Sequence, residues 1–185
     1  MENQSPEITP VATEYAIPTE PVNVAPKISM ESYLDTLRAE QSLPMAFVFG
    51  LAAAVGGAAL WALITVAIDF QIGYMAIAIG FLVGFAVRIG GKGIDKVFAF
   101  SGAALALFSC LLGNVLSIIG YVAKSEGLGF FETLTMVDYG LLPGVMAEAF
   151  SPIDLLFYGI AVYEGFKFSP RQITQEELLE NNVAF

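Results

Sequence analysis

Four long apolar stretches, separated by short polar segments, dominate the hydrophobic pattern of this chain. A transmembrane helix needs about 20 predominantly apolar residues, because the hydrocarbon core of a bilayer is roughly 30 Å thick. Each stretch is long enough, or nearly long enough, for one crossing. The pattern therefore predicts an all-α fold, a four-transmembrane-helix bundle within residues 44–168. The predicted spans are residues 44–68, 72–88, 97–123 and 152–168.

Two polar tails flank this membrane domain. Residues 1–28 are acidic and rich in proline, a composition that buries too little apolar surface to offset the entropy of ordering, so disorder is predicted there. The tail at residues 169–185 carries a short acidic helix signal from Thr174 and ends in apolar residues, which we expect to be exposed. Both tails are expected to bind other proteins rather than fold on their own.

Residues 29–43, just before the first span, have the pattern of a short amphipathic helix. Ser29 is suited to the N-cap position, and apolar residues then recur at helical spacing among charged ones. We expect this helix to lie on the cytoplasmic surface. Its apolar positions are Met30, Tyr33, Leu34 and Leu37.

The segment at residues 124–150 is too polar to cross a membrane and too apolar for an ordinary loop. Gly140, Pro143 and Gly144 interrupt it, so we predict two short helices lying in the outer interface, with aromatic rings at the acyl boundary. Its carboxylates are interpreted as solvated charges rather than as an acid–base pair.

The fourth span has a recognisable start. Ser151 suits the N-cap, Pro152 the first helical position and Asp154 the third, a variant of the capping box. Near the other end, Glu164 and Lys167 are three residues apart. That spacing predicts an ion pair at the cytoplasmic boundary.

The distribution of basic residues predicts the orientation, because positively charged short loops are retained in the cytoplasm. With four crossings, both tails and the loop at residues 89–96 lie on one side, and seven of the eight Lys and Arg residues lie there too. Only Lys124 lies on the opposite side of the membrane. Both termini are therefore predicted to be cytoplasmic. The seven are Lys27, Arg38, Arg88, Lys92, Lys96, Lys167 and Arg171.

The composition of the chain excludes several classes of function. Hydrophobic residues make up 56% of the chain and charged residues 14%, and a net charge of −10 without a basic patch argues against nucleic acid as a partner. The sequence has no histidine, which excludes His-ligated haem, the common zinc hydrolase sites and Ser-His proteases. The single cysteine, Cys110, is interpreted as a packing residue. We therefore expect no enzyme activity, no catalytic residue, no metal site and no cofactor.

Small residues recur every four positions in three of the predicted spans. Helices in lipid associate through close backbone contact, which small residues at this spacing permit. The stripes of the first two spans are expected to face each other across the tight hairpin at residues 69–71; alternatively, a stripe also faces a partner subunit. The three stripes are Gly50, Ala54, Ala58 and Ala62; Gly73, Ala76, Gly80 and Gly84; and Gly102, Ala106, Cys110 and Asn114.

Two features carry candidate chemistry. Asn114 is the one strongly polar side chain well inside a span, and it either joins helices by hydrogen bonds or marks a pathway or cofactor contact. The loop around Gly90 to Asp95 is glycine-rich and basic but lacks the spacing of a P-loop. Its flanking residues Arg88, Lys92 and Lys96 either anchor the chain at the cytoplasmic face or contact an anionic lipid.

The runs WALITVAIDFQIGYMAIAIGFLVGFAVRIGGKG, LFSCLLGN and SPIDLLFYGIAVYEGFKFS resemble a family of small bacterial integral membrane proteins of no established activity. The resemblance covers about two thirds of the chain and excludes both tails. It implies a bacterial inner-membrane protein with variable N-terminal appendages and assigns no functional residue.

These observations lead to one main hypothesis. The chain is expected to be a structural or accessory subunit of a larger inner-membrane complex, with membrane lipids and other membrane subunits as partners. The alternative is a small channel, transporter or lipid-handling protein that uses Asn114 and the outer segment.

Overall fold

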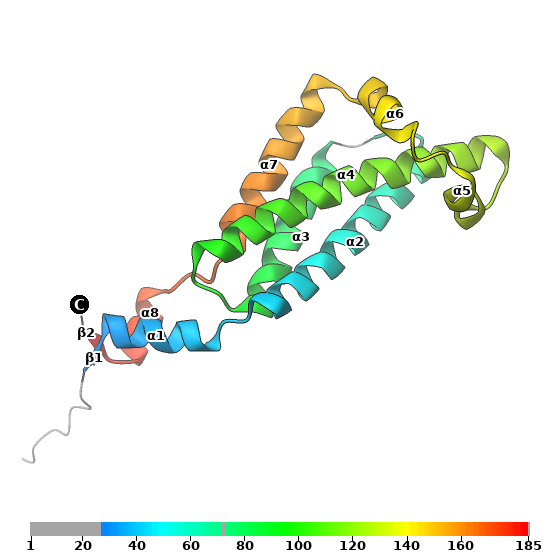
Figure 1. Ribbon diagram of the computed structural model, residues 1–185. Helices are drawn as coiled ribbons and strands as arrows, with labels where there is room; N and C mark the ends of the chain where they lie inside the picture. The colour runs from blue at the N-terminus through cyan, green and yellow to red at the C-terminus, as the bar shows by residue number, and fades with distance from the viewer. Residues whose placement is uncertain (1–26, 72, 185) are drawn as a thin grey trace, which may run out of the picture.

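The computed structural model describes residues 27–71 and 73–184, and within them the fold is all-helical apart from one pair of two-residue strands (Figure 1). This confirms the predicted all-α class. In chain order the elements are β1 (Ile28–Ser29), α1 (Met30–Glu40), α2 (Leu43–Ile68), α3 (Tyr74–Gly91), α4 (Lys96–Glu126), α5 (Phe130–Met136), α6 (Leu142–Ala149), α7 (Pro152–Phe168), α8 (Gln175–Glu180) and β2 (Val183–Ala184).

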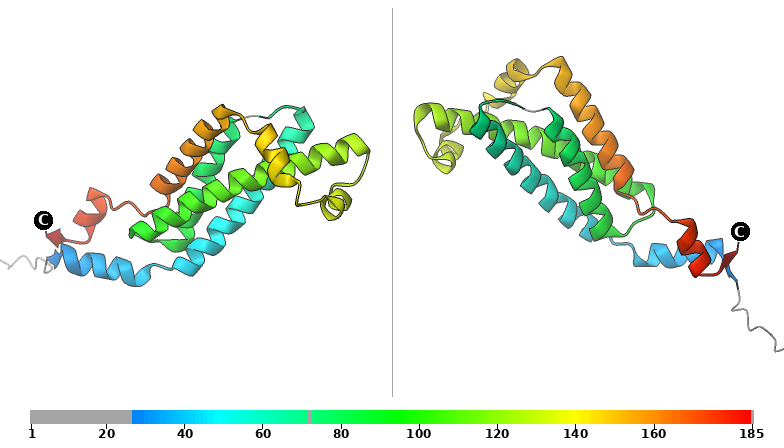
Figure 2. Two further views of the ribbon diagram at one scale, coloured as in Figure 1. Left: turned by 45° about the horizontal axis from the view of Figure 1, so that its top comes forward. Right: turned by 180° about the vertical axis from the view of Figure 1, so that it is seen from behind.

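Helices α2, α3, α4 and α7 lie side by side in an elongated bundle, and each runs antiparallel to the preceding one of the four (Figures 1 and 2). Helix α3 contacts the other three. The bundle core combines a few large side chains with many alanines and glycines, which lets the helix axes approach closely. Its most buried large residues are Trp61, Val83, Val87, Phe98 and Ile119.

Two of these helices, α2 and α4, are long and apolar enough to cross a membrane. The pair α6 and α7 would count as a third span if taken together, although their axes are bent by 100°. The apolar part of helix α3, Met75–Gly91, is shorter than α2 and α4. The described residues therefore contain two or three helices that can span a bilayer, as expected of a membrane protein.

Local signals explain where the helices begin and end. The hydroxyl of Ser42 accepts a hydrogen bond from the Met45 N–H, and Pro44 occupies the first turn of α2, where no N–H is needed. Asp69 and Lys92 adopt left-handed conformations, with φ of 55° and 48°, and close the ends of α2 and α3. Helix α4 ends in the same way at Gly127, with φ of 67°.

Two short helices, α5 and α6, lie at one end of the bundle, as predicted for residues 124–150 (Figure 2). Helix α7 has the predicted bounds. The Ser151 N–H donates to the Asp154 carboxylate at 2.9 Å, so the expected contact of the capping box is present. The chain turns sharply there because this cap and Pro152 start a new helix.

The opposite end carries a small folded unit made of β1, α1, α8 and β2, which we name the terminal module (Figure 1). Ile28 pairs with Val183 and Ser29 with Ala184 in parallel strands. The predicted N-cap of α1 is confirmed, because the Ser29 hydroxyl accepts a hydrogen bond from the Ser32 N–H at 3.2 Å. The core of the module consists of Tyr33, Leu37, Leu178 and Val183, with Met30, Ile94 and Ile173 packed against it.

The terminal module corrects the expectation for the C-terminal tail. Residues 173–184 fold against α1, and Val183, expected to be exposed, is only 5% exposed. The apolar end of the tail fills the hydrophobic face of the amphipathic helix, which would otherwise be in water. The expected disorder of the N-terminal tail falls largely on residues 1–26, outside the described residues.

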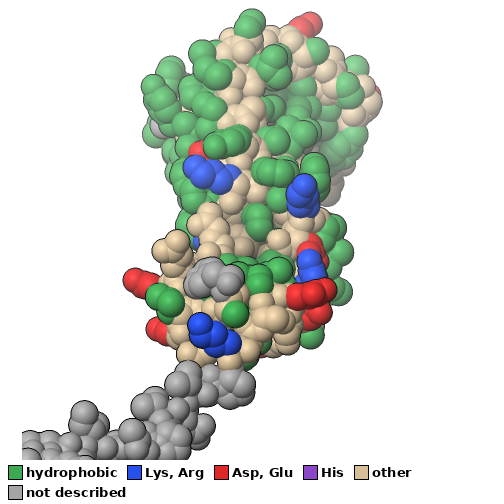
Figure 3. Space-filling model, turned by 90° about the vertical axis from the view of Figure 1, so that its left-hand side faces the viewer, with side chains coloured by type: hydrophobic (Ala, Val, Ile, Leu, Met, Phe, Trp, Pro, Cys, Tyr) green, Lys and Arg blue, Asp and Glu red, His purple; other side chains and the backbone are tan. Residues whose placement is uncertain are grey.

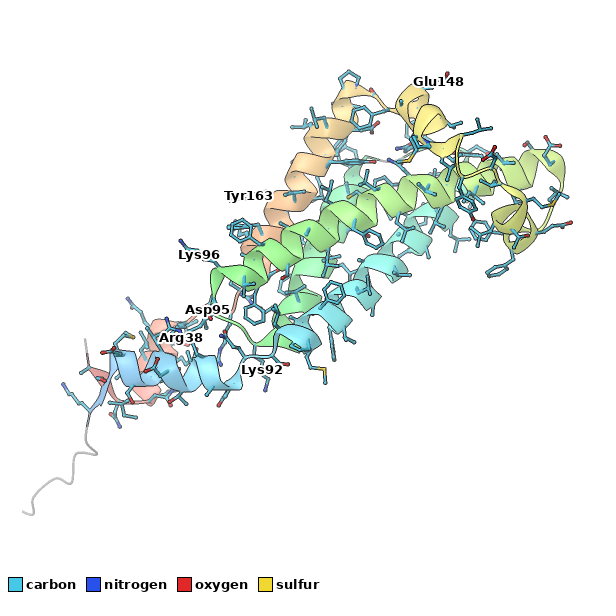
Figure 4. All side chains as sticks on the ribbon, viewed as in Figure 1. Arg38, Lys92, Asp95, Lys96, Glu148 and Tyr163 are labelled. Atoms are coloured by element: carbon cyan, nitrogen blue, oxygen red, sulfur yellow. The ribbon has the colours of Figure 1, made fainter. Side chains whose placement is uncertain are left out.

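The module is attached to the loop between α3 and α4. The Gln41 amide donates to the Asp95 carboxylate at 2.6 Å, and Arg38 forms an ion pair of 3.6 Å with the same carboxylate (Figure 4). The Ser42 N–H donates to the Gly91 carbonyl at 2.9 Å and the Arg171 N–H to the Gly93 carbonyl at 2.7 Å. This loop therefore holds the chain both before α2 and after α7.

Candidate functional site

The first small-residue stripe lies inside the bundle. A Cβ atom at Gly50 would lie 2.5 Å from Val87 of α3 and 2.6 Å from Leu105 of α4, so α2 contacts both helices at this glycine. Ala54 and Ala58 are fully buried. The carbonyl of Ala54 also accepts a hydrogen bond from the Ser109 hydroxyl at 2.7 Å.

The stripe in α3 faces α7, not α2 as expected. A Cβ atom at Gly80 would lie 2.6 Å from the carbonyl oxygen of Ala161, one at Gly84 would lie 3.0 Å from the Cβ of Phe168, and Gly73 lies against the Phe157 ring. Contact with α2 uses a different set of residues on α3. Among them, Gly90 and Gly91 lie against α2, at Met45 and Ala46. A spacing of four defines one face of a helix but not the neighbour that covers it.

The stripe in α4 also meets α7. Gly102 lies against Gly165 and Ser169, and a Cβ atom at Gly102 would lie 2.5 Å from the Gly165 carbonyl oxygen. The Ser169 hydroxyl donates to that carbonyl at 2.5 Å. Glycine on both helices permits this backbone contact.

Asn114 lies in the middle of the same helix, about three turns beyond Gly102, in a small polar cluster. Its side-chain carbonyl accepts a hydrogen bond from the Gln71 amide at 2.9 Å, and its amide nitrogen contacts the Tyr158 hydroxyl. The cluster joins α4, α7 and the segment between α2 and α3. Both ends of the Asn114 amide thus have side-chain partners. The sequence pattern did not reveal these partners, because they lie 43 and 44 residues away along the chain.

The Asn114 cluster borders an open cleft of about 430 Å³ between α4, α6 and α7. Its polar atoms come from amide, phenol and hydroxyl groups, together with the Asp154 carboxylate, which caps α7. The remaining lining is apolar, for example Met146 and Phe150. None of the described residues that line this cleft is basic, so it suits a neutral amphiphile with hydroxyl or carbonyl groups better than a phosphate.

Other buried polar groups in the bundle are dispersed rather than aligned. The hydroxyls of Ser109, Ser117 and Ser169 donate to backbone carbonyls of helices. Within the part of the chain that the structure describes, three buried side-chain atoms lack a hydrogen-bond partner. They are Trp61 Nε1, Thr65 Oγ1 and Glu164 Oε2. A polar row along the bundle, as a permeation pathway requires, is not formed by the described residues.

The expected ion pair between Glu164 and Lys167 is wrong. The Lys167 ammonium instead lies over the rings of Tyr163 and Phe168, at 5.5 and 5.3 Å from their centroids. Glu164 faces α3, where a Cβ atom at Gly80 would lie 3.0 Å from the Glu164 Cβ. Two residues that are three positions apart in a helix can thus contact different neighbours.

The basic residues of the α3–α4 region divide into two groups. Arg88 and Lys92 line a shallow pocket of about 500 Å³ together with Arg171, which lies beyond α7. Lys96, at the first turn of α4, does not line it; Figure 4 shows Lys92 and Lys96 at opposite ends of the loop. The Arg88 Nε donates to the Pro170 carbonyl at 3.0 Å. No sequence signal links Arg171 to Arg88, because only the tertiary fold brings them together.

The described residues contain no group of three or more His, Cys, Asp or Glu side chains that could hold a metal ion. Comparison of the chain with protein families, with curated proteins and with solved structures found no match.

Proposed function

We propose that this chain is a multi-pass protein of a bacterial inner membrane that crosses the bilayer four times, through α2, α3, α4 and α7. The antiparallel order of these helices, with the seven-to-one excess of basic residues, favours a cytoplasmic terminal module. At about 1.5 Å per residue, Met75–Gly91 extends only about 25 Å. Arg88, in the last turn of α3, compensates by extending towards the headgroups.

Within that membrane, the proposed role is that of a structural or accessory subunit of a larger protein complex. The observation that carries this proposal is the terminal module. Its apolar core is filled by its own residues, and the described residues of its four elements expose five acidic side chains against one basic side chain, Arg38. A rigid acidic unit held against the loop between α3 and α4 offers a surface for a basic partner protein. The exposed acidic residues are Glu31, Asp35, Glu40, Glu176 and Glu180.

The construction of the bundle supports the same role. Its helices meet through glycine and alanine, and the buried serine hydroxyls bond to backbone carbonyls. Such contacts hold helices in fixed positions but supply no reacting group. This arrangement is typical of a membrane scaffold.

The test is capture of a stoichiometric partner by the full-length protein, purified from native membranes in a mild detergent and analysed by native mass spectrometry. The variant Glu31→Gln/Glu176→Gln/Glu180→Gln should lose the partner while the bundle stays folded. The matched control neutralises three exposed acidic residues at the other end, Glu132→Gln/Asp138→Asn/Glu148→Gln, and should retain it. A chain without a bound subunit, or equal capture by both variants, would contradict the proposal.

The Asn114 cleft supports a second candidate function, the handling of a lipid or another neutral amphiphile at the outer face. Its mixture of hydrogen-bonding and apolar groups is the specific observation in its favour. Lipid movement by the purified chain alone in liposomes would favour this function over the subunit role. Asn114→Ala should then reduce the rate, whereas Ser125→Ala, at an exposed position of the same helix, should not.

A further inference from the structure

Three basic residues from two separate segments of the chain converge on one pocket at the junction between the bundle and the terminal module. Arg88 belongs to the last turn of α3, Lys92 to its C-cap and Arg171 to the segment after α7. The pocket, of about 500 Å³, is completed by Ile89 and Glu40. Figure 3 shows Lys and Arg side chains at this level, between the largely apolar bundle and the mixed surface of the module.

Two of the three cations are available for an external anion. Among the described residues, neither Arg88 nor Lys92 forms an ion pair. Arg88 uses its Nε to donate to the Pro170 carbonyl, which holds the guanidinium in place and leaves its terminal N–H groups. Arg171 pairs with Glu177. Because Glu177 compensates the charge of Arg171, the described residues of the pocket include two unpaired cations, Arg88 and Lys92, against the Glu40 carboxylate.

The backbone around the pocket is fixed. Lys92 has a left-handed conformation, and its N–H donates to the Arg88 carbonyl at 2.9 Å. The Arg171 N–H donates to the Gly93 carbonyl at 2.7 Å. The three basic residues are therefore anchored to one another by main-chain contacts before any ligand arrives, which limits the entropy lost on binding.

The pocket also borders an apolar surface. Ile89 is 65% exposed on the helix that carries Arg88. An anion bound here would have cationic groups on one side and the hydrocarbon-facing surface of α3 on the other. That combination matches a phospholipid, whose charged phosphate and acyl chains are joined in one molecule.

We infer that Arg88, Lys92 and Arg171 bind the phosphodiester headgroup of an anionic phospholipid from the inner leaflet. The lipid bridges α3 and the segment that leads into α8, and so fastens the terminal module to the bundle at the membrane surface. This inference rests on the proposed membrane orientation but not on the subunit role. Lys96 has no part in the site.

The test is lipid binding by the full-length chain in detergent, measured by native mass spectrometry with phosphatidylglycerol and, for comparison, zwitterionic phosphatidylcholine. Phosphatidylglycerol should bind more tightly. A basic residue near an anionic headgroup is worth about fivefold in affinity, so Lys92→Gln should weaken binding about fivefold and Arg88→Gln/Lys92→Gln about 25-fold. Lys96→Gln/Lys167→Gln removes the same charge from the same end of the bundle and should change binding less than twofold.

Three results would overturn the inference: equal affinity for the two lipids, equal loss in the two double variants, or displacement of the lipid by millimolar glycerol phosphate. The last result would assign the pocket to a soluble phosphate. If Arg88→Gln/Lys92→Gln does not fold, Lys92→Gln decides alone, because the Lys92 side chain makes no hydrogen bond within the described residues. Partner capture is measured separately, so failure here leaves the proposed subunit role standing.

Discussion

The backbones of Gly102 in α4 and Gly165 in α7 approach so closely that a Cβ atom at Gly165 would lie 2.6 Å from the carbonyl oxygen of Gly102. Side chains cannot occupy that space without separating the helices. The closeness of this crossing sets how far α7 lies from the rest of the bundle.

Gly165→Leu should therefore lower the free energy of unfolding by about 1–3 kcal/mol, the usual cost of overpacking. Unfolding in mixed detergent micelles measures this change. The matched control is Gly159→Leu in the same helix, where a Cβ atom would meet nothing within 4 Å. Equal stability of the two variants would show that α4 and α7 do not touch at this glycine pair.

Gly80→Leu and Gly84→Leu should both reduce the yield of folded protein, because their new side chains would push α7 away from α3. Leu82→Ala should have a much smaller effect, since Leu82 is 47% exposed on the same helix. The yield of folded protein from size-exclusion chromatography after extraction is compared among the three variants. A spectroscopic distance between labels on α3 and α7 should increase in the glycine variants while the α2–α3 distance stays constant.

Asn114→Leu should destabilise the bundle by about 0.6–2 kcal/mol, because it removes contacts with both Gln71 and Tyr158. Tyr158→Phe removes one of these contacts and should cost less. Thermal unfolding in detergent measures the stability lost in each variant and so checks this order. A double variant that costs the sum of the two single changes would mean that Asn114 and Tyr158 do not interact in the folded chain.

The terminal module should weaken at alkaline pH. Burial, followed by the hydrogen bond and charge of Glu177, raises the pKa of Tyr33 above its usual 10.0. The folded module therefore holds this proton more tightly than the unfolded chain, so the stabilisation is complete below pH 10 and lost as the pH rises through the higher folded pKa. Hydrogen exchange of α1 and α8 measures the loss, and Tyr33→Phe should remove this part of the pH dependence.

Reporter fusions test the orientation of the membrane domain. Alkaline phosphatase fused after Phe185 should be inactive and a fluorescent protein there should fluoresce, because seven of eight basic residues mark that side as cytoplasmic. Phosphatase inserted after Gly140, between α5 and α6, should be active. Active phosphatase after Phe185 would mean that α7 does not cross the membrane.

The sequence by itself determined the helices of this protein and several of their ends, although α3 extends to Gly91 and α4 to Glu126, each three residues beyond the predicted span. Apolar runs predicted α2, α3, α4 and α7, and local signals such as Ser29 before α1 and Asp154 in α7 predicted starts that the structure confirms. These features depend on residues within one or two turns of each other. Their physical causes, namely capping and apolar length, are therefore readable along the chain.

Only the tertiary structure decided which faces meet. Gly80 looks from its spacing like a contact for α2, yet it packs on α7, and Val183 looks exposed, yet it fills the core of the terminal module. Arg171 joins Arg88 across 83 positions of sequence in the same way. A periodic pattern defines a face relative to its own helix axis. The neighbour that covers this face depends on how all the helices share the available space, which is a property of the packed chain as a whole.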